Sequence, residues 1–305
     1  MRPQPIHLSS GNLIADRRYE WARDAIAKGD FAAAADLLAQ TVELAPTYAA
    51  GWFALGEVRE RLGERDAAIA AFRRALELDA EDRHGAAVRL VHLGALEPAP
   101  MSESYMRGLF DGYAPAFDHA LTEGLHYRGP ELLLRAVEAT GRRMKFGTAL
   151  DLGCGTGLAG AAFRPFVDWL AGVDLSPQML AQARAKGLYD RLVESEALAF
   201  LRAEAALNAR YHLVVAADVF VYFHDLAPLA LVAQVLAPDG LVAFSVETHD
   251  GGSVILRDTL RYAHGEKHVR DALAAAGLQL ISLDFASTRT EKGVPVPGLI
   301  IVAGH

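Results

Sequence analysis

The sequence predicts a chain of two parts, a small all-α region followed by a larger α/β domain built on a mostly parallel sheet. Residues 15–97 are rich in alanine and repeat a pattern of small and aromatic residues with a period of ~34. From residue 147 onward, short apolar segments alternate with helical ones, which is typical of parallel strands joined by helices. A glycine-rich stretch, TALDLGCGTGL at 148–158, lies between the first two of these apolar segments.

Length, composition and charge agree with two domains and exclude some classes of function. The 305 residues exceed one average domain, and the 52% hydrophobic content is ample for packed cores. A net charge of −8 argues against a general nucleic-acid binder. No apolar run approaches the length of a membrane span, and the first residues lack an apolar signal segment. The single cysteine, Cys154, excludes an internal disulfide, and we expect no metal site and a cytoplasmic location.

The all-α part is expected to follow an N-terminal arm at 1–14 and to hold two helical repeats and a capping helix at 15–97. The residues at its packing positions in the second repeat are Trp52, Leu55, Gly56, Ala68, Phe72 and Ala75. This spacing resembles the tetratricopeptide repeat, in which small residues let two antiparallel helices approach closely. Such a module either holds a peptide or serves docking and dimerisation. We therefore expect a homodimer or a protein partner through the repeats.

A linker and lid region is expected at 98–134. Pro98 and Pro100 stop the preceding helix and stiffen the join. Two short helices are expected at 103–113 and 114–123, and a third from Pro130. Aromatic residues recur there at helical spacing, which predicts a face packed on the core.

The α/β domain is expected at 135–305. The strands expected in chain order are 147–153, 169–174, 192–195, 212–218, 241–247, 279–287 and 299–303. Helices are expected at 253–262 and 267–276, before the last two strands. The final two strands read as a hairpin, so the last strand should run against the others.

The glycine-rich stretch indicates a ligand site at the carboxyl end of the sheet. Glycines at 153, 155 and 157 permit a tight turn and a close approach of the backbone to a ligand. Gly155-x-Gly157-x-x-Gly160 also fits the dinucleotide fingerprint. However, Asp151 immediately precedes the turn, where a carboxylate suits a ligand that carries a cation better than a pyrophosphate. Asp174, at the end of the next strand, suits the two hydroxyls of a ribose.

Asp-x-Gly-x-Gly-x-Gly followed by Val-Asp-Leu-Ser-x-x-Met-Leu resembles the signature of class I S-adenosylmethionine-dependent methyltransferases, and the resemblance covers about residues 102–302. It implies a Rossmann-like seven-stranded sheet with the last strand antiparallel. It also implies S-adenosyl-L-methionine as cofactor and S-adenosyl-L-homocysteine as product. The cofactor-binding residues implied in the core are Asp151, Gly153, Gly155, Gly157, Asp174, Leu175, Ser176, Met179, Glu196, Ala197, Asp218 and Val219.

The segment before the core resembles the lid of methyltransferases that carry a tetratricopeptide segment in front. The matching pattern is Tyr…Leu-Phe-Asp-x-Tyr-Ala-x-x-Phe-Asp at 105–118. The resemblance implies that Tyr105 and Tyr113 close over the cofactor, whose sulfonium cation a tyrosine face attracts. The alternative is that both only pack on the core.

Alignment supplies much of the rate of methyl transfer, so a general base is needed only for a nucleophile that holds its proton tightly. His264, with its neighbour Tyr262, is the main candidate, because it lies where relatives close the substrate side. The other histidines considered are His224, His249 and His268. Arg289 lies in a hairpin tip rich in glycine and proline, where it either clamps a substrate carboxylate or is a solvated loop charge.

The first functional hypothesis is methyl transfer to an oxygen or nitrogen of a small molecule, which bears a carboxylate if Arg289 is a clamp. The second is methylation of a protein that the repeats recruit. A non-catalytic adaptor and a dinucleotide oxidoreductase remain as alternatives. Binding of S-adenosyl-L-homocysteine separates the first two hypotheses from the others.

Overall fold

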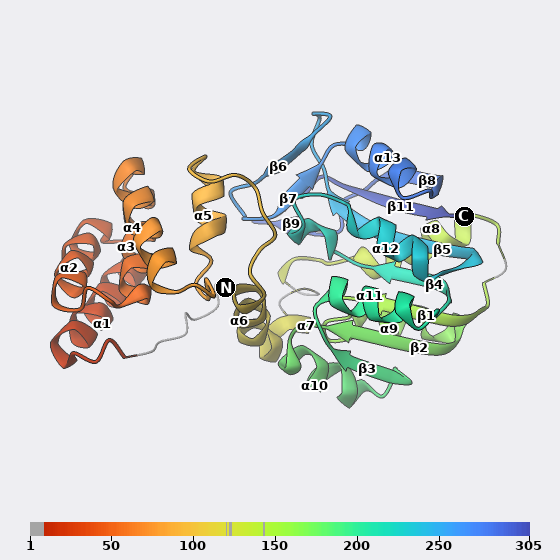
Figure 1. The fold of residues 1–305 in the computed structure, drawn as a ribbon, viewed down its shortest axis with the longest axis horizontal. Coiled ribbons are helices and arrows are strands. Elements are labelled where there is room, and N and C mark those ends of the chain that lie inside the picture. The colour runs from red at the N-terminus through yellow and green to blue at the C-terminus, as the bar shows by residue number, and fades with distance from the viewer. Residues whose placement is uncertain (1–8, 120, 122–123, 143) are drawn as a thin grey trace. The chain divides into compact units, whose positions relative to one another are not determined.

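The computed structural model describes residues 9–119, 121, 124–142 and 144–305. The chain divides into two compact units, Met1–Leu109 and Phe110–His305 (Figure 1). Residues 1–8 of the expected N-terminal arm lie outside the described residues. Within the described part of the chain, every helix is too short or too polar to cross a bilayer.

The first unit consists of two helix pairs and a shorter fifth helix. The helices are α1 (Leu13–Lys28), α2 (Phe31–Leu44), α3 (Ala49–Arg61), α4 (Arg65–Leu78) and α5 (Ala86–His92). Asn12 caps α1 by accepting hydrogen bonds from the backbone of Ile14 and Ala15, and Asp30 caps α2 in the same way. A Cβ atom on Gly56 would lie 2.6 Å from the ring of Phe72, so glycine is what lets α3 and α4 touch.

Four short elements lead from the repeats to the sheet. They are α6 (Glu103–Tyr113), the 3₁₀ turn η1 (Ala114–Ala116), α7 (Phe117–His119) and α8 (Gly129–Ala139). The expected helix at 114–123 is thus a 3₁₀ turn followed by a short helix, since Pro115 starts a new turn rather than continuing α6. Residues 120, 122 and 123 of that expectation lie outside the described residues.

The second unit contains a central sheet in the order β3-β2-β1-β4-β5-β11-β8 (Figure 1). Its strands are β1 (Phe146–Leu152), β2 (Val167–Asp174), β3 (Arg191–Glu194), β4 (Tyr211–Ala216), β5 (Leu236–Glu247), β8 (Gln279–Phe285) and β11 (Gly298–Gly304). Strands β1 to β5 pair in parallel, and β11 runs antiparallel to both β5 and β8. The expected seven-stranded path with a reversed last strand is confirmed.

Helices cover both faces of this sheet. They are α9 (Leu158–Phe163), α10 (Pro177–Lys186), α11 (Ala197–Ala206), α12 (Pro228–Val235) and α13 (Glu266–Ala275). Successive strand residues contribute to opposite cores, as Ala149 and Leu150 do on β1. One core packs against α11, α12 and α13, and the other against α8 and α9. The central strands β1, β4, β5 and β11 are therefore largely buried on both faces, whereas the edge strands β3 and β8 are partly exposed.

The helix expected at 253–262 is wrong. The structure has two short strands there, β6 (Val254–Leu256) and β7 (Tyr262–His264), which pair antiparallel. Leu260 adopts a positive φ of 58° and its N–H donates to the carbonyl of Arg257, which closes the hairpin. Val254 and Ile255 are β-branched and favour strand. β7 then joins the central sheet beside β5.

Several strand ends also differ from expectation, and those of β4 and β5 bear on the site. β4 stops at Ala216, and Asp218 follows it in the left-handed region with φ 56°. β5 begins five residues before 241, with a register shift between Tyr211 and Leu213 on its partner β4. The segment Pro238-Asp239-Gly240 reads as a turn in the sequence, but the irregularity in the pairing with β4 accommodates it.

Candidate active site

The glycine loop joins β1 to α9 at the carboxyl end of the sheet. Gly153, Gly155 and Gly157 have φ values of 66°, 52° and 94°, which other residues adopt at a cost. A Cβ atom on Gly153 would lie 2.6 Å from Cγ2 of Val219, which follows β4. The loop is therefore a bare backbone turn packed against the end of the neighbouring strand.

Asp174 ends β2 and is tied to this loop. Its Oδ2 accepts a hydrogen bond of 2.8 Å from the backbone N–H of Gly155, and its Oδ1 accepts one of 2.9 Å from Ser176. Burial raises the pKa of the carboxyl group, and the two backbone donors oppose that shift. Ser176 caps α10 by accepting from the N–H of Met179 at 3.0 Å.

Asp151 lies deeper than expected, with 2% of its surface exposed. The hydroxyl of Tyr189 donates to its Oδ2 at 2.6 Å, while Oδ1 is buried without a hydrogen-bond partner among the described residues. Burial, with a further contribution from the charge of Asp174, raises the pKa of Asp151 to about 7. The two carboxylates are near enough to interact, but Tyr189 covers one side of Asp151.

The segment Phe110–His119 is fastened to the glycine loop and to α10 by two carboxylates. Ser176 donates to Asp111 at 2.5 Å. Thr156, within the loop, donates to Asp118 at 2.5 Å, and the ammonium of Lys186 lies 2.6 Å from the same carboxylate. We call this segment the lid.

The two tyrosines expected in the lid lie in different units. Tyr113 ends α6 in the second unit and is half-buried. Tyr105 belongs to the first unit, where its ring packs against the backbone of Gly85. A role for either in cofactor binding stays a prediction.

The remaining residues expected around the adenine are placed at element ends. Glu196 caps α11, accepting from the backbone of Leu198 at 2.9 Å and of Ala199 at 2.7 Å. Both side-chain oxygens of Glu196 therefore already have backbone partners. Ala197 is the first residue of that helix. Met179 is fully buried in α10, and Leu175 is half-buried.

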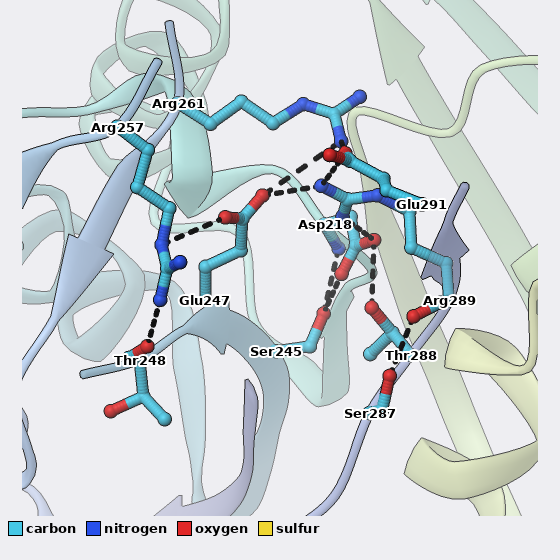
Figure 2. Close-up of polar contacts among 10 residues, drawn as sticks. All are labelled: Asp218, Ser245, Glu247, Thr248, Arg257, Arg261, Ser287, Thr288, Arg289 and Glu291. Atoms are coloured by element: carbon cyan, nitrogen blue, oxygen red, sulfur yellow. Dashed lines mark hydrogen bonds and ion pairs between the residues drawn. The ribbon is translucent and has the colours of Figure 1, made fainter. Parts of the chain in front are cut away.

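Asp218 is held in a fixed orientation by hydroxyl and guanidinium groups (Figure 2). Ser245 accepts from its backbone N–H at 2.8 Å and donates to its Oδ1 at 2.6 Å. Thr288 donates to Oδ2 at 3.1 Å, and Nη1 of Arg289 lies 3.4 Å from the same oxygen. This carboxylate, expected beside the methyl donor, is thus largely engaged within the protein.

Arg289 is buried, with 2% of its surface exposed, so it is not a solvated loop charge. Its Nη2 donates to Glu247 at 2.5 Å and to Glu291 at 3.1 Å (Figure 2). Burial alone would lower the pKa of the guanidinium, but Asp218 and Glu247 together raise it. Three carboxylates already occupy the guanidinium fork, which the clamp alternative would assign to a substrate carboxylate.

His264 and Tyr262 lie inside the packing around β7. His264 is fully buried, with its ring stacked on that of His268 at 5.3 Å and Nε2 at 3.3 Å from the carbonyl of Phe220. Burial, and then His268, lower the pKa of His264 to about 4, so the ring is neutral near pH 7. Tyr262 is 2% exposed, and burial raises its pKa. Their catalytic roles stay predictions.

The other histidines considered have local partners. Nε2 of His224 lies 3.0 Å from a carboxylate oxygen of Asp225. The ring of His249 accepts from the N–H of Gly251 and contacts the carbonyl of Ser253. Among the described residues, no three or more histidine, cysteine, aspartate or glutamate side chains gather as a metal site.

Tyr127 is a site residue that the sequence pattern did not indicate. Backbone hydrogen bonds of 2.7 Å join the segment around it to the hairpin, from Arg128 to Thr288 and from Thr290 to Leu125. Burial raises the pKa of the Tyr127 hydroxyl; the charge of Asp218 raises it further, while that of Arg289 lowers it. The residue as a whole is half-buried, so part of its surface is exposed to solvent. It lies in an irregular connection. The one nearby feature of the sequence is Arg-Gly-Pro, which follows it at the start of α8.

Comparisons with known proteins cover both units. A family model described as a methyltransferase domain matches residues 122–283, and one described as a tetratricopeptide repeat matches residues 25–90. Methyltransferase-like protein 27 of Homo sapiens is 42% identical over 85 residues, which are 27% of this chain and 34% of that protein. The chain thus spans about a third of the length of the curated relative it matches.

Solved structures similar to this chain include two methyltransferases. One is an S-adenosylmethionine-dependent methyltransferase from Clostridium acetobutylicum ATCC 824, 17% identical, covering 64% of this chain and 98% of that one, with a TM-score of 0.46. Another is magnesium protoporphyrin IX methyltransferase (ChlM) from Synechocystis PCC 6803 with bound SAH. It is 18% identical, and the match covers 66% of this chain and 98% of that one, with a TM-score of 0.49.

Proposed function

The chain belongs to the methyltransferase domain family, and on that premise we propose that it transfers the methyl group of S-adenosyl-L-methionine to an oxygen or nitrogen atom of a small molecule that bears a carboxylate. The observation that carries this proposal is the bare glycine loop with Asp174 bound to its middle at 2.8 Å. The product is S-adenosyl-L-homocysteine.

The residues present fit this cofactor. The Oδ1 atom of Asp151 is buried and has no hydrogen-bond partner among the described residues, so it matches the ammonium of a methionine group. Each oxygen of Asp174 has one backbone donor and retains capacity for a ribose hydroxyl. A side chain at Gly153 would clash with Val219. The loop therefore presents bare backbone, which a ligand can approach closely.

The cofactor supplies a methyl group already activated by a positively charged sulfur. The residues of the chain then bind the cofactor and orient it. Asp151 and Asp174 hold the two polar ends of the cofactor, and the lid, fastened by Asp111 and Asp118, covers the loop and excludes water. His264 is neutral near pH 7, but its lowered pKa makes it a weak proton acceptor, so alignment rather than a general base is expected to supply the rate.

Calorimetric titration with S-adenosyl-L-homocysteine tests the proposal. The wild-type protein should bind it with micromolar affinity. Asp174→Ala should weaken binding by about a hundredfold, because two backbone donors and the ribose hydroxyls lose their charged acceptor. Asp168→Asn is the matched control, since Asp168 lies on the same strand with its side chain exposed. Absence of binding by the wild-type protein would refute the assignment.

A protein acceptor is the second candidate function, and the tetratricopeptide match at 25–90 is the observation that favours it. The repeats would recruit the substrate protein or a second copy of the chain. Capture of a methylated partner should then require residues 15–97. Methylation of the same partner at an unchanged rate by a protein lacking these residues would count against recruitment.

A further inference from the structure

Three arginines and three carboxylates meet beyond the ends of β4 and β5 (Figure 2). The arginines are Arg257, Arg261 and Arg289, and the carboxylates are those of Asp218, Glu247 and Glu291. The formal charges balance. The three arginines differ, however, in how fully their donors are used.

Two of the three guanidinium groups are committed to the protein. Arg289 is bound to all three carboxylates and is shielded from solvent. Arg257 donates from Nη2 to the carbonyl of Thr248, and its Nε lies 3.4 Å from Glu247. Neither guanidinium therefore has both terminal nitrogens available for a ligand.

Arg261 is different. Its Nη1 lies 3.7 Å from Glu291 and 3.8 Å from Glu247, both beyond hydrogen-bond distance, and no described residue accepts a hydrogen bond from its side chain. A quarter of the side chain, 25%, is exposed. In Figure 2, one terminal nitrogen faces the two carboxylates and the other points away from them. The guanidinium of Arg261 therefore has N–H donors without a hydrogen-bond acceptor among the described residues, on a side chain that is partly exposed to solvent.

The place of Arg261 connects it to the proposed cofactor site. Its guanidinium lies over the ring of Tyr222, 5.7 Å from the centroid. Tyr222 belongs to η4 (Phe220–Tyr222), directly after the Val219 that packs on Gly153. The ring of Phe110, in the lid, meets Tyr222 edge-on at 5.4 Å. Arg261 and Tyr222 thus lie beside the lid and close to the strand end that packs on the glycine loop.

We propose that Arg261, lying on the ring of Tyr222, binds the carboxylate of a planar, aromatic methyl acceptor. This rests on the function proposed above and moves the carboxylate clamp from Arg289, whose donors are occupied, to Arg261. A guanidinium fork pairs with a carboxylate through two parallel hydrogen bonds, and the aromatic rings of Tyr222 and Phe110 beside it favour an aromatic acceptor. Glu291, 34% exposed, is the carboxylate that the acceptor must displace or outcompete.

The test uses the full chain saturated with S-adenosyl-L-homocysteine, and benzoate and benzamide as probes in ligand-observed NMR titrations. Wild-type protein should bind benzoate about tenfold more tightly than benzamide, which has the same shape but no charge. Arg261→Gln should abolish that preference, and Arg261→Lys should retain part of it. Arg202→Gln, at an exposed position on α11, is the matched control and should change nothing.

Glu291→Gln provides a second, opposite readout. Removing the charge that competes for Arg261 should strengthen benzoate binding, an effect that loss of folding cannot imitate. Equal binding of both probes by wild type, or an unchanged preference in Arg261→Gln, would overturn the proposal. Calorimetry with S-adenosyl-L-homocysteine on each variant keeps the two proposals apart, because failure of the cofactor site appears there and failure of the acceptor site does not.

Discussion

One arginine orders the carboxyl ends of β4 and β5. Arg289 comes from the hairpin between β8 and β11 and reaches both Asp218 and Glu247 in the interior. Its neighbours Thr288 and Thr290 bind the backbone around Tyr127. A buried ion pair adds little net stability over an apolar replacement, but removal of one partner strands the other charge. Arg289 therefore holds Asp218 and Glu247 in position, and adds little to the net free energy of unfolding compared with apolar replacements.

Replacing Arg289 should expose this dependence. Arg289→Gln leaves Asp218 without its cation and Glu247 with only the longer contacts to Arg257 and Arg261, and should lower the free energy of unfolding by about 3–5 kcal/mol. Arg135→Gln, which removes a surface partner of Glu131, should cost at most about 1 kcal/mol. Urea unfolding of both variants compares the two. Equal losses would show that the buried cluster is not coupled as described.

Asp151 should make the stability of the ligand-free protein fall as the pH rises. Its pKa is about 7 in the folded protein and about 3.8 when exposed, so the folded state holds the proton over that interval. The contribution changes little below pH 4, declines between pH 4 and 7, and is then lost, on the order of 4 kcal/mol in total.

Asp151→Asn keeps an acceptor for Tyr189 and cannot ionise. It should therefore unfold at a higher temperature than the wild type at pH 8, with a smaller difference at pH 5. Differential scanning calorimetry at both values measures this. A constant difference between the two pH values would mean that Asp151 titrates normally.

At the scale of an element, the glycine loop depends on backbone conformation and on the absence of side chains. Gly153 needs both, because its φ is 66° and a Cβ atom would strike Val219. Gly187 ends α10 with a φ of 65°, but a Cβ atom there would meet nothing within 4 Å. A comparison of substitutions at Gly153 and Gly187 therefore distinguishes the cost of a positive φ from the cost of a steric clash.

Gly187→Ala should cost only about 1–2 kcal/mol of stability and leave binding of S-adenosyl-L-homocysteine intact. Gly153→Ala should cost more and abolish binding, since the loop must shift away from Val219 and Asp174. Thermal unfolding and calorimetric titration of both variants provide the comparison. Normal binding by Gly153→Ala would show that the loop does not contact the ligand.

At the scale of the whole molecule, each unit has cores of its own. The repeat unit is packed around apolar clusters between its helices, and the α/β unit around one cluster on each face of its sheet. The carboxylates, glycine loop and arginines of the candidate site all lie in the second unit. Cofactor binding is thus expected to be a property of that unit.

A protein that begins at Met101 keeps α6 and the whole α/β unit. It should bind S-adenosyl-L-homocysteine with an affinity within about threefold of the full chain, because no site residue except Tyr105 belongs to the first unit. Calorimetry on both proteins measures this. Because this protein still contains Tyr105, a large loss of affinity in its folded form would instead assign a role to the repeats.

The sequence by itself determined the family, the two-part organisation and the order of the main strands. The match of the methyltransferase and tetratricopeptide models confirms the first two. These features were readable because they are local: repeat spacing, glycines in one turn, and a carboxylate at the end of each strand lie within short windows. The helix expected at 253–262 was wrong because β-branched residues and a turn at Leu260 favour a hairpin, and the pairing of β7 with β5 adds this hairpin to the sheet.

Only the tertiary structure decided how the charged groups are used. Arg289 and Asp218 are 71 positions apart, and Asp151 and Tyr189 are 38 apart, so no local pattern relates them. Folding brings these side chains together in an interior where burial raises the pKa of Asp151 and where Asp218 and Glu247 engage Arg289. The same packing leaves Arg261 with unused donors, because geometry, rather than residue type, determines which of three arginines can meet a ligand.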